Sequence, residues 1–487
     1  MELAVVGAGH VGAVCAACMA AVGHRVRVVD VDAQRIALLR AGRAPFFEPG
    51  ISELLEQGRT RELLSFHVDP AEALPGAALV FLCVNTDNGP DGSVDLSYVE
   101  SAVQTVSRFA DDGAVLVNRS TAPVGTAQYI RSMIEELRGG SLHVAVNPEF
   151  LAEGTAVHDF LEPDRILVGA WDKRPIALLA EAYAPIVERR LPSDLREMLA
   201  NGQRRTGDVP FVVTDPASAE LAKYASNSLL AVRVSFINEI AGIAEELGAD
   251  ITKVARAVGL DTRIGPHFLR AGIGWGGSCF PKDIVALQGI AETRGLSARM
   301  LRAANEVNTE QRMWTTRQLQ SHFKTLFGRR VGLLGLSFKP GTDDMRNAPS
   351  LEIASQLAQA NVQVRALDPA VKALPAGFED KIELLEDPES LATGADALVL
   401  VTEWPEFADL DLRRLRGLMR TPLLLDGRNF FDPELARSAG FTYTGVGRAQ
   451  EVAGVVLALP DAEPAAGESK PAPGGRQQWP RRGTGTR

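Results

Sequence analysis

The stretch from Gly274 to Asp283 reads Gly-Trp-Gly-Gly-Ser-Cys-Phe-Pro-Lys-Asp and places a thiol, Cys279, where a helix is expected to begin. Pro281 is favoured in the first turn of a helix, and the free amides at a helix start stabilise a thiolate. We therefore predict a lowered pKa for Cys279 and a role as nucleophile. Asp283 follows four residues later, on the same face of that helix. The alternative interpretation is a buried, inert cysteine after a loop.

A second chemically suggestive segment is a glycine-rich turn near the start of the chain. An apolar strand precedes it, and a helix and a second strand, residues 25–29, lead from it to Asp30. Its three glycines are Gly7, Gly9 and Gly12. In this order the residues predict a dinucleotide-binding fold, because the glycines let a diphosphate approach the helix start and Asp30 accepts hydrogen bonds from the adenosine ribose. Asp30 would repel the extra phosphate of NADP, so we predict NAD.

Composition bounds the class of protein. A chain of 487 residues, at about 150 residues per domain, predicts three domains. Hydrophobic residues at 46% and charged residues at 23% are typical of a globular enzyme, and no apolar run reaches the length of about 20 residues that spans a bilayer. We expect a soluble cytoplasmic protein without a membrane partner. The net charge of -10 argues against a nucleic-acid partner.

The cysteines predict neither disulfides nor a metal site. The chain has four of them: Cys15, Cys18, Cys83 and Cys279. Cys15 and Cys18 have the spacing of half a zinc site, but they lie in an apolar helix and no second half follows. We interpret these two as packing residues and expect no bound metal.

Three further strands are predicted over 79–84, 114–118 and 143–146, separated by helical stretches. Polar residues follow each strand: Asn85, Thr86, Ser120, Thr121, Asn147, Pro148 and Glu149. The carboxyl ends of parallel strands share one edge of the sheet, where ligands of doubly wound folds bind. We therefore expect substrate and nicotinamide to meet at this edge.

The middle of the chain predicts helices. Apolar residues at spacings of three and four predict one long amphipathic helix over 218–247, and a second long helical pattern runs over about 298–327. Lys223 and Asn227 lie four residues apart on one face of the first helix. The polar, Arg-rich stretch 192–210 before it predicts a surface loop or boundary. Central helical segments of this kind commonly form dimer interfaces.

A second alternation of strands and helices begins after Arg330. Buried strands are predicted over 331–336, 362–367, 397–401 and 423–425. The predicted fold class is therefore α/β, with two doubly wound, Rossmann-like domains joined by a central all-helical domain. The predicted boundaries are 1–200, 211–325 and 326–459, followed by a disordered tail over 460–487.

Several ordered motifs carry a resemblance to a known family. Besides the cysteine stretch, they are residues 120–125, 147–154, 218–227, 338–346 and 426–429. With them the chain resembles the UDP-glucose/GDP-mannose dehydrogenase family over about residues 1–450. The resemblance implies two successive NAD-dependent oxidations of a nucleotide sugar, through a cysteine-bound thiohemiacetal and thioester. Residues 236–239 and the cysteine stretch look most like the members that oxidise UDP-glucose to UDP-glucuronate at C6.

The resemblance also implies roles for single residues. The implied catalytic set is Cys279, Lys223, Asn227, Asp283, Thr121 and Glu149. Lys223 and Asn227 would hold an oxyanion, Asp283 and Thr121 would order a water, and Glu149 would act as acid or base through it. In addition to the three glycines and Asp30, the implied cofactor contacts are Val11, Arg35, Thr86, Thr121, Glu153 and Arg346. The implied substrate contacts are Phe150, Leu151, Glu153, Lys223, Asn227, Arg263, Arg270, Trp275, Gly276, Lys339 and Arg428.

In relatives, the residue that matches Arg263 reaches across the dimer interface, so the resemblance implies a homodimer or a higher homo-oligomer. Two alternatives stay open. The same chemistry would serve GDP-mannose or a UDP-N-acetylhexosamine. A non-catalytic regulator that binds nucleotide sugars would be expected to have lost Cys279, Lys223 or Asp283, and all three are present.

Overall fold

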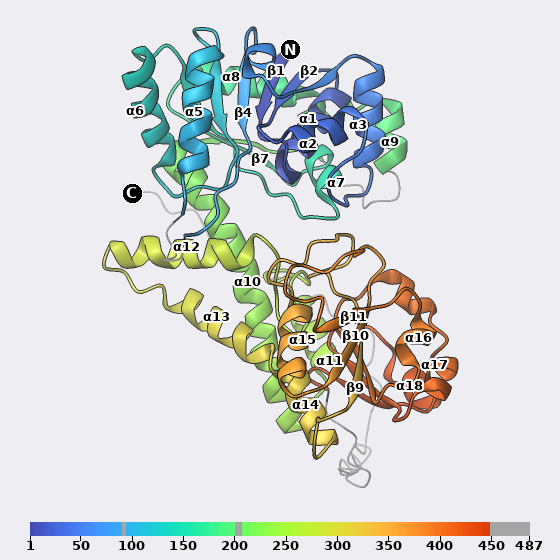
Figure 1. The fold of residues 1–487 in the computed structure, drawn as a ribbon. Coiled ribbons are helices and arrows are strands. Elements are labelled where there is room, and N and C mark those ends of the chain that lie inside the picture. Colours follow the sequence, from blue (N-terminus) through green and yellow to red (C-terminus); the bar gives the residue numbers. More distant parts are fainter. Residues whose placement is uncertain (90–93, 200–206, 449–487) are drawn as a thin grey trace, which may run out of the picture. The chain divides into compact units, whose positions relative to one another are not determined.

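The chain up to Thr214 builds an eight-stranded sheet with strand order β3-β2-β1-β4-β5-β6-β7-β8 in the computed structural model (Figure 1). The structure describes residues 1–89, 94–199 and 207–448. Neighbouring strands are parallel except β6 and β7, which are antiparallel. The strands are β1 (Glu2–Val6), β2 (Arg25–Val29), β3 (Leu64–His67), β4 (Leu79–Leu82), β5 (Val115–Asn118), β6 (His143–Val146), β7 (Ile166–Ala170) and β8 (Phe211–Thr214).

Helices cover both faces of this sheet, each over its own apolar core. One core packs against α1 (His10–Ala21), α2 (Ala33–Arg40), α3 (Ile51–Thr60), α7 (Ala156–Leu161), α8 (Lys173–Val187) and α9 (Ser193–Met198). The other packs against α4 (Pro70–Ala73), α5 (Ser97–Phe109) and α6 (Thr126–Arg138). Because the strands alternate their side chains between two cores, the sheet is buried on both faces.

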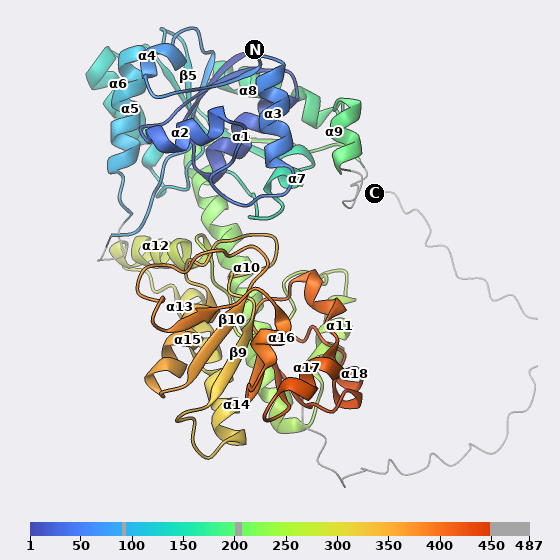
Figure 2. The same cartoon turned by 45° about the vertical axis from the view of Figure 1, so that its right-hand side comes forward.

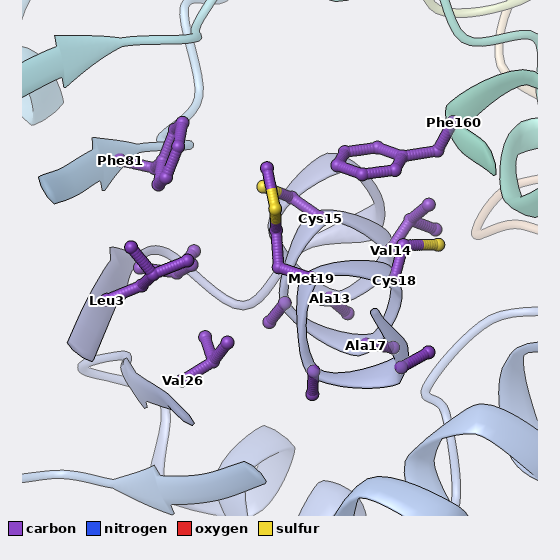
Figure 3. Close-up of a cluster of buried hydrophobic side chains, with 14 of the residues drawn as sticks. Leu3, Ala13, Val14, Cys15, Ala17, Cys18, Met19, Val26, Phe81 and Phe160 are labelled. Atoms are coloured by element: carbon purple, nitrogen blue, oxygen red, sulfur yellow. The ribbon is translucent and has the colours of Figure 1, made fainter. Parts of the chain in front are cut away.

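Helix α1 is enclosed by the sheet and by other helices. Its apolar residues on all sides are suited to this position. Figure 3 shows Cys15, Cys18 and Met19 of α1 among Leu3 of the sheet and Phe160 of α7. Both cysteines are fully buried and free, which confirms them as packing residues.

The segment between the sheets is helical. Its helices are α10 (Pro216–Leu247), α11 (Ile251–Gly259), α12 (Phe280–Thr293), α13 (Arg299–Gln311) and α14 (Trp314–His322). The long helix predicted over 218–247 is confirmed as α10, which runs unbroken in both views (Figure 1, Figure 2). It begins at its cap Asp215, which accepts from Ser218 N, and ends at Gly248 in the left-handed conformation.

The second long helical pattern, predicted over about 298–327, does not form one continuous helix. Its pattern is divided between α13 and α14, and the break falls at Arg312 and Met313. There the Arg312 guanidinium donates to the carbonyls of Trp275 and Asn347. The loop predicted over 192–210 is also partly wrong, because α9 forms there and buries Leu195 in the first core.

The second sheet has six parallel strands in the order β11-β10-β9-β12-β13-β14. They are β9 (Arg330–Leu334), β10 (Gln363–Leu367), β11 (Ile382–Leu384), β12 (Ala397–Leu400), β13 (Leu423–Asp426) and β14 (Thr442–Gly445). The helical elements around it are α15 (Pro349–Gln359), α16 (Pro388–Ala392), α17 (Leu412–Leu418), α18 (Pro433–Ser438) and the 3-10 helix η2 (Pro405–Asp409). Helix α15 packs on one face, and α16, α17 and α18 pack on the other (Figure 2).

This architecture confirms the predicted fold class of two doubly wound sheets joined by helices. Strand β8 belongs to the first sheet, so that sheet continues past the predicted boundary at residue 200. The predicted tail over 460–487 lies outside the described residues. Within the described part of the chain, no helix is both long and apolar enough to cross a membrane. The same residues contain no cluster of three or more His, Cys, Asp or Glu side chains suited to a metal ion.

Candidate active site

The glycine-rich turn between β1 and α1 has the shape that a dinucleotide diphosphate needs. A Cβ atom on Gly7 would lie 2.3 Å from the carbonyl oxygen of Cys83, and one on Gly12 would lie 1.9 Å from the carbonyl oxygen of Gly7. A Cβ on Gly9 would meet nothing within 4 Å. The chain is therefore closely packed on one side of the turn and open at Gly9, beside the first amides of α1. This arrangement fits the diphosphate of NAD.

Asp30, directly after β2, holds this turn through its carboxylate. Its carboxylate accepts from Ala8 N at 2.6 Å and from Asp32 N at 2.8 Å, and Arg35 Nη1 donates to it at 3.0 Å. Three hydrogen bonds leave acceptor capacity on a carboxylate, which has about four lone-pair sites. The structure thus brings together Asp30, Arg35 and the glycine turn, as the sequence predicted.

Asp30→Ala is expected to raise the dissociation constant of NAD at least about tenfold, because it removes the predicted ribose acceptor and the anchor of Ala8. NAD titration by calorimetry measures this. The matched control is Asp32→Ala, which removes a carboxylate two residues away that caps α2. It should lower stability slightly, through loss of the helix cap, and leave NAD affinity nearly unchanged. Equal NAD affinity in Asp30→Ala and the wild-type protein would contradict the ribose contact.

Three of the polar residues on the buried face of α10 each hold a different segment around the site. Glu220 accepts from the amides of Gly125 and Ala127, both at 2.7 Å, at the start of α6. Lys223 Nζ donates to Glu149 Oε1 at 2.8 Å, and Asn227 Nδ2 donates to Asp283 Oδ2 at 2.6 Å. All three α10 side chains are buried. Helix α10 therefore positions the loop that contains Thr121, the segment after β6 and the start of α12.

Lys223 and Glu149 form a buried ion pair. Burial raises the pKa of Glu149, but Lys223, the Leu151 amide and Arg119 together hold it below its ordinary value. Burial lowers the pKa of Lys223, but Glu149, Cys279 and Asp283 together hold it above its ordinary value. The ammonium is therefore stable in this site, which suits a group that stabilises an oxyanion.

Cys279 caps the start of α12, as predicted, and Asp283 N donates to its carbonyl at 3.0 Å. The predicted lowering of its pKa is wrong. Burial raises the pKa of the thiol, and the charges of Glu149 and Asp283 raise it further, while Lys223 and Ser278 only partly oppose this. The helix start alone does not decide the pKa, because the thiol is enclosed by protein and near two carboxylates.

Asp283 is held on two sides. Besides Asn227, it accepts from Lys282 Nζ at 2.8 Å through its other carboxylate oxygen. Only 1% of Asp283 is exposed, so its charge is compensated by protein groups rather than by solvent. Asp283 follows Cys279 in the first turn of α12, as predicted. It also pairs with Lys282, a cation to which the sequence analysis assigned no role.

Glu153 connects the first sheet to the cysteine loop and to the second sheet. Its carboxylate accepts from Ser278 Oγ at 2.8 Å and, more weakly, from Thr342 Oγ1 and Arg346 Nη2, both at 3.4 Å. Burial and the neighbouring Asp344 raise the pKa of Glu153. Glu153, Arg346 and the cysteine loop are therefore brought together, as the cofactor and substrate predictions require.

Glu48 is a residue that sequence reasoning missed. Its buried carboxylate accepts from Gly154 N at 2.7 Å and from Ala156 N at 2.8 Å, and it pairs with His10 Nε2 at 2.9 Å. It thereby joins the glycine-rich turn to the segment that carries Glu153. No local sequence pattern identifies Glu48, because its partners lie 38 to 108 residues away along the chain.

Of the remaining predicted cofactor residues, Thr86 and Thr121 lie on loops at the carboxyl ends of the strands, and Val11 lies on α1. Thr86 Oγ1 donates to the Thr121 carbonyl at 2.6 Å, which joins the loops after β4 and β5. Val11, in the first turn of α1, packs against the first core. Phe150 lies beneath the Lys223 ammonium, with the nitrogen 5.6 Å from the ring centroid, and Leu151 packs against the first core.

Two predicted substrate residues are occupied by protein contacts. Arg428 donates from Nε to the Val401 carbonyl at 2.8 Å and from Nη1 to the Gly274 carbonyl at 3.0 Å. Burial lowers the pKa of its guanidinium. The Trp275 indole is buried and donates to Ser235 Oγ at 2.9 Å, so it packs among the central helices. Both residues fix the loop around Gly276, where a Cβ would lie 2.3 Å from the Asn347 carbonyl oxygen.

The other predicted substrate cations differ in their exposure. Lys339 is partly buried, and burial lowers its pKa although Glu153 opposes this. Arg270 is exposed. Arg263 has an 87% exposed side chain that pairs with Asp261, and the single chain does not bring it to the other site residues.

Comparison with known proteins agrees with this geometry. Residues 1–187, 217–310 and 332–433 match the NAD-binding, central and UDP-binding domains of the UDP-glucose/GDP-mannose dehydrogenase family. A UDP-glucose 6-dehydrogenase from Pseudomonas aeruginosa is 41% identical, over 92% of this chain and 98% of that protein. The chain belongs to the UDP-glucose/GDP-mannose dehydrogenase family.

Solved structures agree as well. A UDP-glucose dehydrogenase from Pyrobaculum islandicum superposes with a TM-score of 0.82 at 38% identity, over 92% of this chain and 98% of that one. A UDP-D-ManNAc dehydrogenase from Pyrococcus horikoshii gives a TM-score of 0.79 at 26% identity, over 92% and 99%. The NAD-binding domain of the family matches the segment in which the glycine turn and Asp30 fit that cofactor.

Proposed function

We propose that this protein is an NAD-dependent UDP-glucose 6-dehydrogenase, which oxidises UDP-glucose to UDP-glucuronate by two successive two-electron steps. One observation carries the proposal: Cys279, Lys223, Asn227, Asp283 and Glu149 come from three distant segments and converge on the buried face of α10. A non-catalytic regulator would have no need to keep a thiol, an ammonium and two carboxylates together in a buried site.

The protein groups divide the chemistry among them. NAD, when bound, accepts a hydride in each oxidation. The Lys223 ammonium and the Asn227 amide stabilise the oxyanion that forms on the C6 oxygen when its hydroxyl proton is removed, before the hydride leaves. Cys279 then attacks the aldehyde and holds the carbon as a thiohemiacetal, from which the second hydride leaves to give a thioester. Asp283, Thr121 and Glu149 are suited to orient the water that hydrolyses the thioester.

The choice of UDP-glucose rests on the relatives. The two relatives named for UDP-glucose are 41% and 38% identical to this chain, whereas the UDP-D-ManNAc dehydrogenase is 26% identical. The match to the UDP-binding domain of the family supports a UDP-sugar. A panel of UDP-glucose, GDP-mannose and UDP-N-acetylhexosamines, each supplied with NAD, tests this. UDP-glucose should have the highest kcat/KM, and a preference for another sugar would contradict the assignment.

We further propose that the protein is a homodimer or a higher homo-oligomer that uses the outer face of α10. Large apolar residues of this helix are exposed in the single chain: Leu221 46%, Leu229 60%, Phe236 52%, Ile243 49% and Leu247 77%. They recur at helical spacing on one face, opposite the buried polar face. An apolar stripe of this length on a single chain is typical of a protein interface.

The variant Leu229→Glu/Phe236→Glu is expected to sediment as a monomer, because two buried charges would oppose association. We also expect it to lose activity, since the resemblance places the residue matching Arg263 in the partner's site. Sedimentation velocity and NADH formation measure both properties. The control Leu435→Glu changes an equally exposed leucine, 66% exposed on α18, and should keep both. A strictly monomeric variant with full activity would contradict the shared site.

A further inference from the structure

The hydroxyl of Ser278 lies between the Cys279 thiol and the carboxylate of Glu153, a residue of the segment that follows β6. Ser278 Oγ is 3.5 Å from Cys279 Sγ and 2.8 Å from Glu153 Oε1. The second contact spans 125 residues of sequence, so the fold and not chain adjacency creates it. None of the roles described above uses Ser278.

The chemistry of the three groups fixes the direction of these hydrogen bonds. A carboxylate only accepts, so the Ser278 hydroxyl donates its hydrogen to Glu153. The serine oxygen then has lone pairs for one donor, and the thiol hydrogen of Cys279 is that donor at 3.5 Å. The result is a continuous chain from Sγ–H to Oγ–H to the Glu153 carboxylate.

The cations that act on Cys279 are Lys223, Lys339 and Arg346, and the other carboxylates that face it are already engaged. Glu149 accepts from Lys223 and from the Leu151 amide, and Asp283 accepts from Asn227 and Lys282. Among the described residues, Glu153 is the carboxylate that a chain of hydrogen bonds joins to the sulfur.

Glu153 is suited to receive a proton. Burial and the negative charge of Asp344 raise its pKa, while His10 and Arg346 oppose this. Asp344 lies within hydrogen-bonding reach of Glu153 and stabilises the protonated form. Burial raises the pKa of the Cys279 thiol, so attack on an aldehyde at neutral pH requires a proton acceptor.

We propose that Ser278 and Glu153 form a proton relay for Cys279. This proposal rests on the proposed function. As the sulfur lone pair bonds to C6 of the aldehyde, the Sγ–H bond breaks and its proton passes to Ser278 Oγ. The serine hydroxyl proton passes to Glu153 at the same time. The carbonyl electron pair moves to the aldehyde oxygen, which takes a proton from the Lys223 ammonium.

The relay runs in reverse at the end of the reaction. When the thiohemiacetal is oxidised, its hydroxyl proton returns to Lys223. When water hydrolyses the thioester, the carbon–sulfur bond breaks, and the departing thiolate takes a proton from Ser278, which is resupplied by Glu153. Each group ends in the protonation state in which it began. The water contributes the second carboxylate oxygen, and both of its protons are released.

A single-turnover experiment with excess enzyme and NAD tests the relay on UDP-glucose. NADH appears in two phases, and the ratio of the second rate to the first isolates the thiol-dependent step within one trace. Ser278→Ala and Glu153→Gln should each lower this ratio about a hundredfold at neutral pH. Glu153→Gln keeps an oxygen that accepts a hydrogen bond from Ser278. A lower ratio in this variant therefore reports the loss of proton transfer rather than the loss of the hydrogen bond.

The pH dependence separates a relay from a purely structural role. Without the relay the thiol must ionise directly, so the ratio in both variants should rise about tenfold per pH unit below the thiol pKa. The control Thr342→Val removes the other hydroxyl that bonds Glu153 without touching the sulfur, and it should keep the wild-type ratio. An unchanged ratio in Ser278→Ala, or a lowered ratio that does not respond to pH, would overturn the relay. A wild-type protein that forms no NADH from UDP-glucose would instead contradict the proposed function.

Discussion

Cys279→Ser is expected to lower the rate of the second oxidation about a thousandfold or more, while the first hydride transfer continues. A serine hydroxyl ionises far less readily than a thiol and is a poorer leaving group, so both capture of the aldehyde and release of the acid should stall. Rapid-mixing measurement of NADH with excess enzyme should show one fast equivalent. Mass spectrometry of the quenched wild-type enzyme should show a sugar adduct on the Cys279 peptide.

Cys18→Ala provides the matched control for this variant. Cys18 is a fully buried thiol in α1 that takes no part in the site, so its loss should cost some stability and leave two NADH per sugar. Undiminished conversion of UDP-glucose to the acid by Cys279→Ser would refute the nucleophile.

Lys223→Met is expected to abolish activity and to destabilise the protein by about 3–5 kcal/mol, because it leaves the Glu149 charge buried without its partner. Lys223 and Glu149 are only 3% and 5% exposed, so solvent cannot replace the ammonium. Urea unfolding measures the free energy, and NADH formation measures the activity.

The double variant Lys223→Met/Glu149→Gln distinguishes the two effects. It removes both charges, so it should regain most of the lost stability and remain inactive, because no ammonium is left to stabilise the oxyanion. If the single variant Lys223→Met is as stable as the wild-type protein, the ion pair of Lys223 and Glu149 is not buried as described. Recovered activity in the double variant would contradict the role of Lys223.

The parts of the fold that follow from local patterns were predicted well. Strand β2 was predicted to the residue, and α10 was predicted to within two residues, because its cap Asp215 and terminal Gly248 mark its ends. Strands β3, β7, β8, β11 and β14 were missed. β7 pairs antiparallel with β6, and β8 is an edge strand with exposed valines, so their positions depend on tertiary pairing rather than on a local run of apolar residues.

Which face of α10 is buried could not be predicted from hydrophobicity. The apolar face is exposed in the single chain, and the face with Glu220, Lys223 and Asn227 is buried. These polar groups are buried because each one meets a partner that lies 56 to 95 residues away in the chain. Periodicity identifies the helix, but only the partners determine its orientation.

The same distinction applies to the site. The spacing of Cys279, Pro281 and Asp283 predicted a helix start with a thiol at its cap, and α12 begins there. The pKa of the thiol was predicted with the wrong sign, because burial and the charges of Glu149 and Asp283 arise only in the folded chain. Ser278 and Glu48 were missed for the same reason, since their partners are distant in sequence.

The stoichiometry of NADH tests the central claim most directly, which is that one site carries out both oxidations while Cys279 holds the carbon. UDP-glucose is supplied in limiting amount with excess NAD, and NADH and the sugar product are counted at completion. The account predicts two NADH per UDP-glucose and UDP-glucuronate as the product. One NADH per UDP-glucose, with a released aldehyde, would contradict it.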